Sequence, residues 1–498
     1  MSHPTAETPF VGSRTLIVGI FGGVTSALAL VIIFMVILSA TDSANTGAAG
    51  YLPLAYSAFA VVLAAVLVGA FVRRVRVQVS AGLAWIIGVV SFTVSFVPWW
   101  GLAGGNLDLG VLIYRGLKVP QGIIQFWDLS LVMQSVDCAR WGFDIYAENN
   151  GCLADPSIYA PGMVWLRFVP FDVFSESNAA ALGVIMIVIS SLVLVSLARS
   201  SRGIGQIILL IAAVGGPWLL LLERGNIDAV ILWVAVVSAL LVSKIGLKRG
   251  SGWRVLWPWV VAAMLIWIVG TWKYYPFALG LMLLPALRIK RGWVVVVGFG
   301  VASAGYLIAT WSNFQFSSQS NSNMIDYGDF VVLGRIPVAA RMLEYGDVLF
   351  FALAVIAFTW GVFVSRSVIQ LGRFPDKNIP FAMLAAGGSA LYLASVLIAG
   401  FGYGYKAVFL LLAVPLLSRW VGSPTRAIAA SSLLVLIFVA IESFVVWNTV
   451  LATTVGVVAA AFSLGAAGLL LFGRSVMESE HVTLERSAAL AADRDNNS

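Results

Sequence analysis

The segment Ser177–Ala198, SNAAALGVIMIVISSLVLVSLA, decides the fold of this chain. It contains no charged side chain, and an apolar helix of about 20 residues crosses the hydrocarbon core of a bilayer. Similar runs recur along all 498 residues, of which 60% are hydrophobic and only 11% are charged, with a mean hydropathy of +0.96. An ordinary soluble domain has about a quarter charged residues. The composition therefore predicts an integral membrane protein and excludes a soluble enzyme, a disordered regulator and a nucleic-acid-binding domain.

About fourteen apolar segments follow one another, which predicts an all-α polytopic bundle of about 14 transmembrane helices. Two of them, 275–287 and 407–418, are short for a complete span, so we expect them to be tilted, half-inserted or broken. The segments cover approximately 15–38, 52–72, 80–101, 177–198, 204–222, 226–243, 255–272, 275–287, 293–311, 347–365, 380–400, 407–418, 427–447 and 450–472.

The lysines and arginines lie in short clusters between these segments, as in membrane proteins whose basic loops stay in the cytoplasm. Because of this pattern, the net charge of +7 does not indicate nucleic acid. With both termini cytoplasmic, the tails 1–14 and 475–498 flank a membrane domain over 15–474, and long loops over 102–176 and 312–346 face outward. The protein is then a multi-pass cell-membrane protein with its active face extracytoplasmic. The basic residues on the outside are Arg115, Lys118, Arg140, Arg167, Arg224, Lys273, Arg335, Arg341 and Lys406.

Both cysteines, Cys138 and Cys152, fall in the first outer loop. An oxidising compartment would allow a disulfide between them, worth about 3 kcal/mol in the chain-entropy model, although two free thiols are the alternative. The only histidines, His3 and His481, lie in the terminal tails. We therefore expect no metal and no cofactor, and any acid–base chemistry falls to carboxylates, lysines or tyrosines.

The first polar cluster of the outer face begins at Asp128, directly after the aromatic pair Phe126 and Trp127. Residues 128–141 fit an amphipathic helix that lies on the membrane surface. A carboxylate at this boundary is a candidate general base, with Asp137 as the second candidate. The simpler alternative is that Asp128 caps the helix.

Arg224 lies outside and next to apolar spans, where a charge is costly and indicates function. The arginine fork suits phosphate, and Asn226 is placed to cap the following helix, whose N-terminus attracts anions. Glu223 could instead neutralise Arg224 as a structural pair, with Asp228 serving the helix dipole. The sequence leaves both interpretations open.

Lys273 is a second outer cation at the end of a span, followed by Tyr274, Tyr275 and the helix-breaking Pro276. The tyrosines either stack on a sugar or belong to the aromatic belt of the membrane interface. Carboxylates and two cations at one membrane boundary suit a lipid-linked phosphate whose headgroup reaches the carboxylate.

These motifs resemble glycosyltransferase family 87 of the GT-C superfamily, over about residues 102–290. The family pattern has an early Asp, then Gly-x-Asp-x-Tyr, Tyr-Pro-Pro, Arg-Gly-Asn and Lys-x-Tyr-Pro, in this order. Val132 and Ala160 stand where the family has tyrosine and proline. The matching residues are Asp128, Gly142, Asp144, Tyr146, Tyr159, Pro161, Arg224, Gly225, Asn226, Lys273, Tyr275 and Pro276.

The resemblance implies an inverting transferase that moves a sugar, expected to be mannose, from a polyprenyl-phosphate donor to a glycolipid or cell-envelope glycan. Asp128 or Asp137 would be the catalytic base, and membrane lipids surround the GT-C-like bundle. Arg224 and Lys273 would stabilise the departing phosphate. The other substrate-binding residues implied are Asp144, Tyr146, Tyr159, Asn226 and Tyr275.

Two other functions remain open. A transporter or flippase of lipid-linked sugars would carry polar residues near the middle of its spans and paired broken helices, and Glu442 is a candidate for such a residue. A non-catalytic envelope protein that keeps the GT-C fold would tolerate replacement of Asp128.

Overall fold

The computed structural model describes residues 81–103, 126–147, 151–153, 157, 159–169, 173–243, 253–313, 337–370, 378–399, 404–423, 425–444 and 455–471. All regular elements in these ranges are helices, and no strand occurs in them, which confirms the all-α prediction. The first two predicted spans, both terminal tails and most of the loop 312–346 lie outside the described residues.

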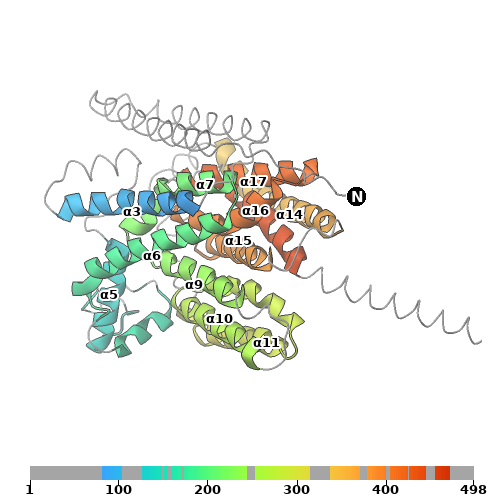
Figure 1. Ribbon diagram of the computed structural model, residues 1–498. Coiled ribbons are helices and arrows are strands. Elements are labelled where there is room, and N and C mark those ends of the chain that lie inside the picture. The colour runs from blue at the N-terminus through green and yellow to red at the C-terminus, as the bar shows by residue number, and fades with distance from the viewer. Residues whose placement is uncertain are drawn as a thin grey trace, which may run out of the picture.

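The helices pack as a bundle around one large buried apolar core (Figure 1). Their sequences are apolar on every side, which is expected of helices surrounded by other helices or by lipid. The long α-helices are α3 (Ala81–Ala103), α6 (Ala179–Ser200), α9 (Asp228–Leu241), α10 (Trp253–Trp272), α11 (Trp293–Ala309), α14 (Pro337–Gln370), α15 (Ile379–Ala399), α17 (Arg426–Phe444) and the helix Val455–Leu471.

Several of these helices are long and apolar enough to cross a bilayer, so the chain is a multi-pass membrane protein. Within the described residues five helices meet the requirement, and six do so if one bent pair is counted as a single span. The total of fourteen spans stays a prediction. The five helical stretches are Glu176–Ser200, Trp253–Trp272, Phe351–Ile369, Ile379–Val396 and Arg426–Ser443.

The two short predicted segments both depart from a regular α-helix. Segment 275–287 forms the 3₁₀ helix η5 (Tyr275–Arg288). At about 2.0 Å per residue, its 14 residues extend about 28 Å, close to the thickness of the hydrocarbon core. Segment 407–418 is broken into the 3₁₀ helix η8 (Gly404–Ala413) and the short α16 (Val414–Trp420).

The predicted span 204–222 is not one straight helix. It consists of α7 (Ile204–Ala213) and α8 (Gly216–Glu223), which meet at a bend of 47°. Pro217 in the first turn of α8 has no backbone N–H to continue the ladder of α7. Gly215 lies so close to the backbone carbonyl of Ser443 in α17 that a side chain at this position would collide with it.

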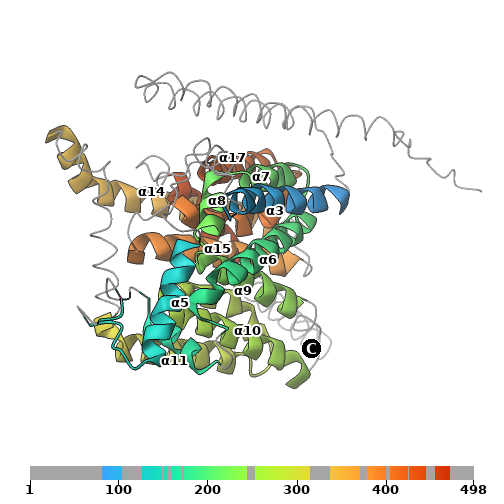
Figure 2. The same cartoon turned by 90° about the vertical axis from the view of Figure 1, so that its left-hand side faces the viewer.

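One end of the bundle carries the elements of the first long loop. The predicted surface helix is α5 (Trp127–Arg140), and the short 3₁₀ helices η2 (Pro161–Phe168) and η3 (Glu176–Asn178) follow it. In Figure 1, α6, α9 and α10 run across the view and α5 lies at their left-hand ends; Figure 2 shows α5 from that side. We call the end of the bundle at which α10 stops, at Trp272, the site end.

Candidate functional site

The first turn of α5 is bound to the turn between α8 and α9. Phe126 donates its backbone N–H to the carbonyl of Glu223 at 2.9 Å, and Asp128 donates to the carbonyl of Arg224 at 3.0 Å. Phe126 has a φ of 55° and Gly225 a φ of 60°, and the left-handed backbone at Gly225 favours glycine. These turns bring Asp128 to Arg224 across 96 residues of sequence.

Asp128 is 8% exposed, and its carboxylate accepts hydrogen bonds on both oxygens. Arg224 donates to Oδ1 from Nε at 2.8 Å and from Nη2 at 2.5 Å, and Asn226 donates Nδ2 to Oδ2 at 2.6 Å. A carboxylate has about four lone-pair positions, so these three donors leave about one for a further group. The N-cap position of α5 is Phe126 and Asp128 is the second residue of the helix, so the interpretation of Asp128 as the N-cap is wrong.

A second ion pair lies beside the first. Asp228, 0% exposed at the start of α9, accepts from Lys273 Nζ at 2.7 Å and from the Tyr275 hydroxyl, both on Oδ1. Among the described residues no donor reaches its other oxygen, Oδ2. This fully buried carboxylate oxygen keeps its capacity to accept a hydrogen bond.

Asn226 joins the two ion pairs. While its Nδ2 donates to Asp128, its Oδ1 accepts from Lys273 Nζ at 3.0 Å and from the backbone N–H of Asp228 at 3.0 Å. The second of these bonds satisfies the backbone donor of the first residue of α9, while the N-cap position of this helix is Ile227 and not Asn226 as predicted. Asn226 therefore fixes the distance between the carboxylate of Asp128 and the ammonium group of Lys273.

Tyr159, in the loop that precedes η2, packs its ring against the Lys273 ammonium group. Lys273 Nζ lies 5.5 Å from the centre of its ring and 5.9 Å from that of Tyr275, within the range of cation–π contacts. The next residue, Ala160, donates its backbone N–H to the carbonyl of Trp272 at 3.0 Å. This bond holds the loop segment at the end of α10.

Three further residues at this site, Asp228, Tyr405 and Lys406, were not predicted from the sequence to be site residues. Asp228 was interpreted as serving the helix dipole. Tyr405 and Lys406 come from η8 and are buried. Tyr405 and Lys406 interact electrostatically with Asp228, and Lys406 donates to the carbonyl of Ser395 at 3.1 Å. The signal for Lys406 was its place among the basic residues on the outside, the same signal that identified Lys273.

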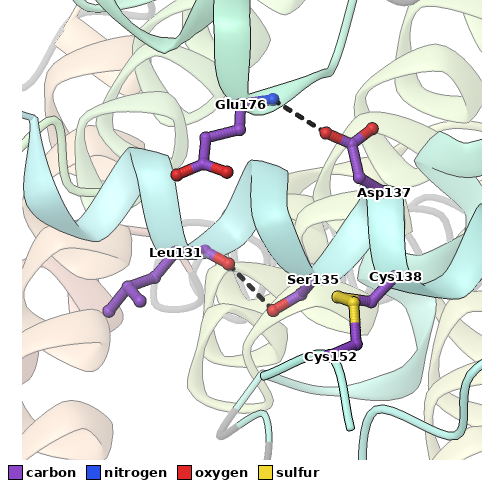
Figure 3. The surroundings of a disulfide bond; sticks show 6 residues. All are labelled: Leu131, Ser135, Asp137, Cys138, Cys152 and Glu176. Carbon is purple, nitrogen blue, oxygen red and sulfur yellow. Dashed lines mark hydrogen bonds between the residues drawn. A yellow bond between two sulfur atoms is a disulfide. The ribbon is translucent and has the colours of Figure 1, made fainter. Parts of the chain in front are cut away.

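Asp137, the second candidate base, makes different contacts. It pairs with Arg140 at 3.0 Å and accepts the backbone N–H of Glu176 at 3.0 Å, as Figure 3 shows for the latter. Nine residues along α5 from Asp128 correspond to about 13 Å. The Asp137 contacts connect α5 to η3, and its catalytic role stays a prediction.

Asp144 and Tyr146 lie in the turn that follows α5. Asp144 is exposed and accepts the backbone N–H of Tyr146 at 3.0 Å, which closes the turn. The Tyr146 hydroxyl is buried without a partner among the described residues, and burial, followed by the neighbouring Tyr306 and Tyr274, raises the pKa of Tyr146. Tyr146 therefore remains a neutral phenol that can donate or accept a hydrogen bond.

Cys138 and Cys152 form a disulfide with their Cα atoms 5.9 Å apart (Figure 3). The bridge ties the end of α5 to the loop, which turns at Gly142 and Gly151 with φ values of 86° and 77°. The alternative of two free thiols does not hold. Within the described part of the chain, no group of three or more His, Cys, Asp or Glu side chains is arranged to hold a metal ion.

The structure thus brings together residues from four separate sequence motifs, in a site that contains two ion pairs and a third cation. Comparison with family models, with curated proteins and with solved structures finds no match to this chain.

Proposed function

We propose that the chain is a membrane glycosyltransferase of the GT-C type, which transfers a sugar, expected to be mannose, from a polyprenyl phosphate to a glycolipid or cell-envelope glycan. One observation carries this proposal: Asn226 connects the Asp128–Arg224 pair to the Lys273–Asp228 pair. A carboxylate that can take a proton therefore lies next to cations that can receive a phosphate, at the end of a membrane helix.

The proposed reaction is a single displacement. The oxygen of an acceptor hydroxyl forms a bond to the anomeric carbon of the sugar while the bond from that carbon to the phosphate oxygen breaks. Asp128 takes the hydroxyl proton, and the lipid phosphate leaves with the electron pair. Attack and departure on opposite faces invert the anomeric carbon, as in one-step inverting glycosidases.

The cations can stabilise the negative charge that develops on the leaving phosphate. The Lys273 ammonium has three N–H donors, of which Asn226 and Asp228 take two. Arg224 adds a second positive charge to the same network through its two hydrogen bonds to Asp128. Binding of phosphate at Lys273 and proton transfer to Asp128 then occur in one hydrogen-bonded network.

The disulfide supports an extracytoplasmic site. Disulfides persist in oxidising compartments, and Cys138 is on the same helix as Asp128. We therefore propose that α5 and the site face the outside of the cell membrane, as the distribution of basic residues predicts.

A second candidate function is transport of a lipid-linked sugar. The bend between α7 and α8 and the buried hydrogen-bonded pair of Glu442 in α17 and Tyr392 in α15 favour it. Broken helices and intramembrane carboxylates mark substrate pathways in transporters. A transporter would move the labelled lipid without forming a glycosidic bond.

The test uses the full chain in lipid nanodiscs with labelled polyprenyl-phosphate mannose and an extract of envelope lipids as acceptors. Wild type is compared with Asp128→Asn and with Glu176→Gln, a matched control because the Glu176 carboxylate is exposed on the same loop. We expect label in a new lipid with wild type and Glu176→Gln. A general base contributes about 10²–10⁴-fold, so Asp128→Asn should lose at least about 100-fold.

Equal transfer by wild type and Asp128→Asn would contradict Asp128 as the base and would direct attention to Asp228, Asp137 or Asp144. If wild type transfers no label, the donor is replaced by other polyprenyl-phosphate sugars. Movement of intact donor between the leaflets of proteoliposomes, without transfer to any acceptor, would favour the transporter instead.

A further inference from the structure

The helix η2 is attached to the sides of α10 and α11 near the site end. Gly162 packs directly on Thr271 of α10 with no room for a side chain. The Tyr306 hydroxyl of α11 accepts the backbone N–H of Gly162 at 2.9 Å and donates to the carbonyl of Thr271 at 2.9 Å. The start of η2 is therefore fixed between two helices of the bundle.

Beyond Gly162, the same face of η2 continues with two large apolar side chains that are exposed. Trp165 is 47% exposed and Phe168 is 71% exposed. Residues three apart in a 3₁₀ helix lie one above the other, so these two large side chains share one face. The Arg167 guanidinium lies 4.7 Å from the centre of the Phe168 ring and donates to the carbonyl of Ala139 at 3.5 Å.

This face continues the exposed apolar surface of α10. The ring of Trp165 lies 5.8 Å from that of Trp267, whose neighbours Met264 and Ile268 on the same side of α10 are exposed. Trp267 lies five residues before the end of α10 at Trp272, which is about 7.5 Å along the helix axis. Side chains of surface helices enter the headgroup and acyl boundary to about 5–10 Å.

We infer that η2 inserts into the bilayer leaflet at the site end, with Trp165 and Phe168 among the acyl chains and Arg167 at the lipid phosphates. The partner is the lipid surface, because the exposed face is continuous with the apolar surface of α10. A tryptophan, a phenylalanine and an adjoining arginine have the composition that recognises this boundary. The extracytoplasmic loop 102–176, in which only residues 128–141 were predicted to lie on the membrane surface, therefore also contacts the membrane at η2.

The insertion places lipid directly beside the candidate site. Tyr159, which covers Lys273, precedes Gly162 by three residues, and the backbone between them is bonded to Trp272 through Ala160. The same short segment, 159–168, therefore contacts the lipid headgroups through η2 and the Lys273 cation of the site through Tyr159. This inference concerns membrane contact and does not depend on glycosyl transfer.

Nitroxide depth measurements on the full chain in nanodiscs of mixed zwitterionic and anionic phospholipids test the inference. The native cysteines are joined in a disulfide, so a single introduced cysteine is labelled selectively without reductant. The test variants are Phe168→Cys and Trp165→Cys, both at exposed side chains. Val301→Cys, 67% exposed on α11, is the lipid reference, and Lys290→Cys, exposed in the turn between η5 and α11, is the aqueous reference.

We expect the label at positions 168 and 165 to collide more with dissolved oxygen than with a polar nickel complex, as at Val301→Cys. Collision dominated by the nickel complex, as at Lys290→Cys, would show that η2 lies in water and would overturn the inference. Protection from both agents would show that another protein surface covers η2 and would also overturn it. As a control, each labelled variant should unfold at the same temperature as wild type, which would show that the fold is retained.

Discussion

The Asp128 carboxylate and the Arg224 guanidinium, 96 residues apart in sequence, form an ion pair with two N–H donors on one carboxylate oxygen. The pair connects the surface helix α5 to the turn between two membrane helices. Because both groups are largely withdrawn from water, each depends on the other for its charge compensation. The same contact therefore has a structural and a proposed chemical role, which different measurements can separate.

Replacement of one partner should destabilise the protein more than replacement of both. Asp128→Asn removes the negative charge that faces Arg224, and Arg224→Gln removes the positive charge that faces the Asp128 carboxylate. Breaking a buried pair costs about 3–5 kcal/mol, and partial exposure of this pair should reduce the cost to about 1–3 kcal/mol. Thermal unfolding of both single variants and of the double variant gives the coupling energy. Additive losses would show that the pair contributes no net stability.

The second ion pair predicts a different response at Tyr275. Tyr275→Phe removes one hydrogen bond from the fully buried Asp228 carboxylate and leaves Lys273 in place. A hydrogen bond to a charged group contributes about 1.5–3 kcal/mol, so unfolding should become easier by that amount. Tyr274→Phe is the matched control, since its hydroxyl makes a long 3.4 Å bond to the carbonyl of Thr310. Similar losses for the two variants would contradict a special role of the Asp228 contact.

The sequence could predict that these motifs lie close together, because each was predicted at the outer boundary of the membrane. The sequence could not predict which carboxylate pairs with which cation. Glu223 is adjacent to Arg224 in sequence, but the left-handed turn at Gly225 and the backbone bonds to Phe126 direct the guanidinium to Asp128. Pairing depends on backbone geometry that hydropathy does not report.

The sequence also could not predict whether the short segments form α-helices or 3₁₀ helices. In a uniformly apolar segment such as Tyr275–Arg288 no face is distinguished, so periodicity cannot separate an α-helix from a 3₁₀ helix. Lys406 was noticed only as an outer basic residue, because its approach to Asp228 depends on how η8 packs in the second half of the chain. Long-range packing determined these features.

The disulfide should stabilise the loop that carries Tyr146. Cys138→Ala with Cys152→Ala removes a link of 14 residues, and a loop of this size contributes about 3 kcal/mol in the chain-entropy model. We expect a lower unfolding temperature and faster proteolysis between residues 141 and 152, while the helices of the bundle are retained. Treatment of wild type with a reductant should reproduce both effects. An unchanged proteolysis pattern would show that the packing of Ile145 against Ala139 and its neighbours holds the loop without the disulfide.

The break between α7 and α8 predicts a contrast between two glycines. At Gly215 an added methyl group would collide with the carbonyl of Ser443, which belongs to the backbone of α17 and cannot rotate away. Gly215→Ala should therefore force the bent pair away from α17, at the cost of about 1–3 kcal/mol expected for overpacking. Gly298→Ala in α11 is the control, because nothing lies within 4 Å of the added methyl group. There we expect stability to be unchanged or raised by up to about 1 kcal/mol, since alanine favours the helix. Unfolding temperatures in the same nanodiscs measure both effects, and equal tolerance of the two substitutions would show that α8 and α17 are not in close backbone contact.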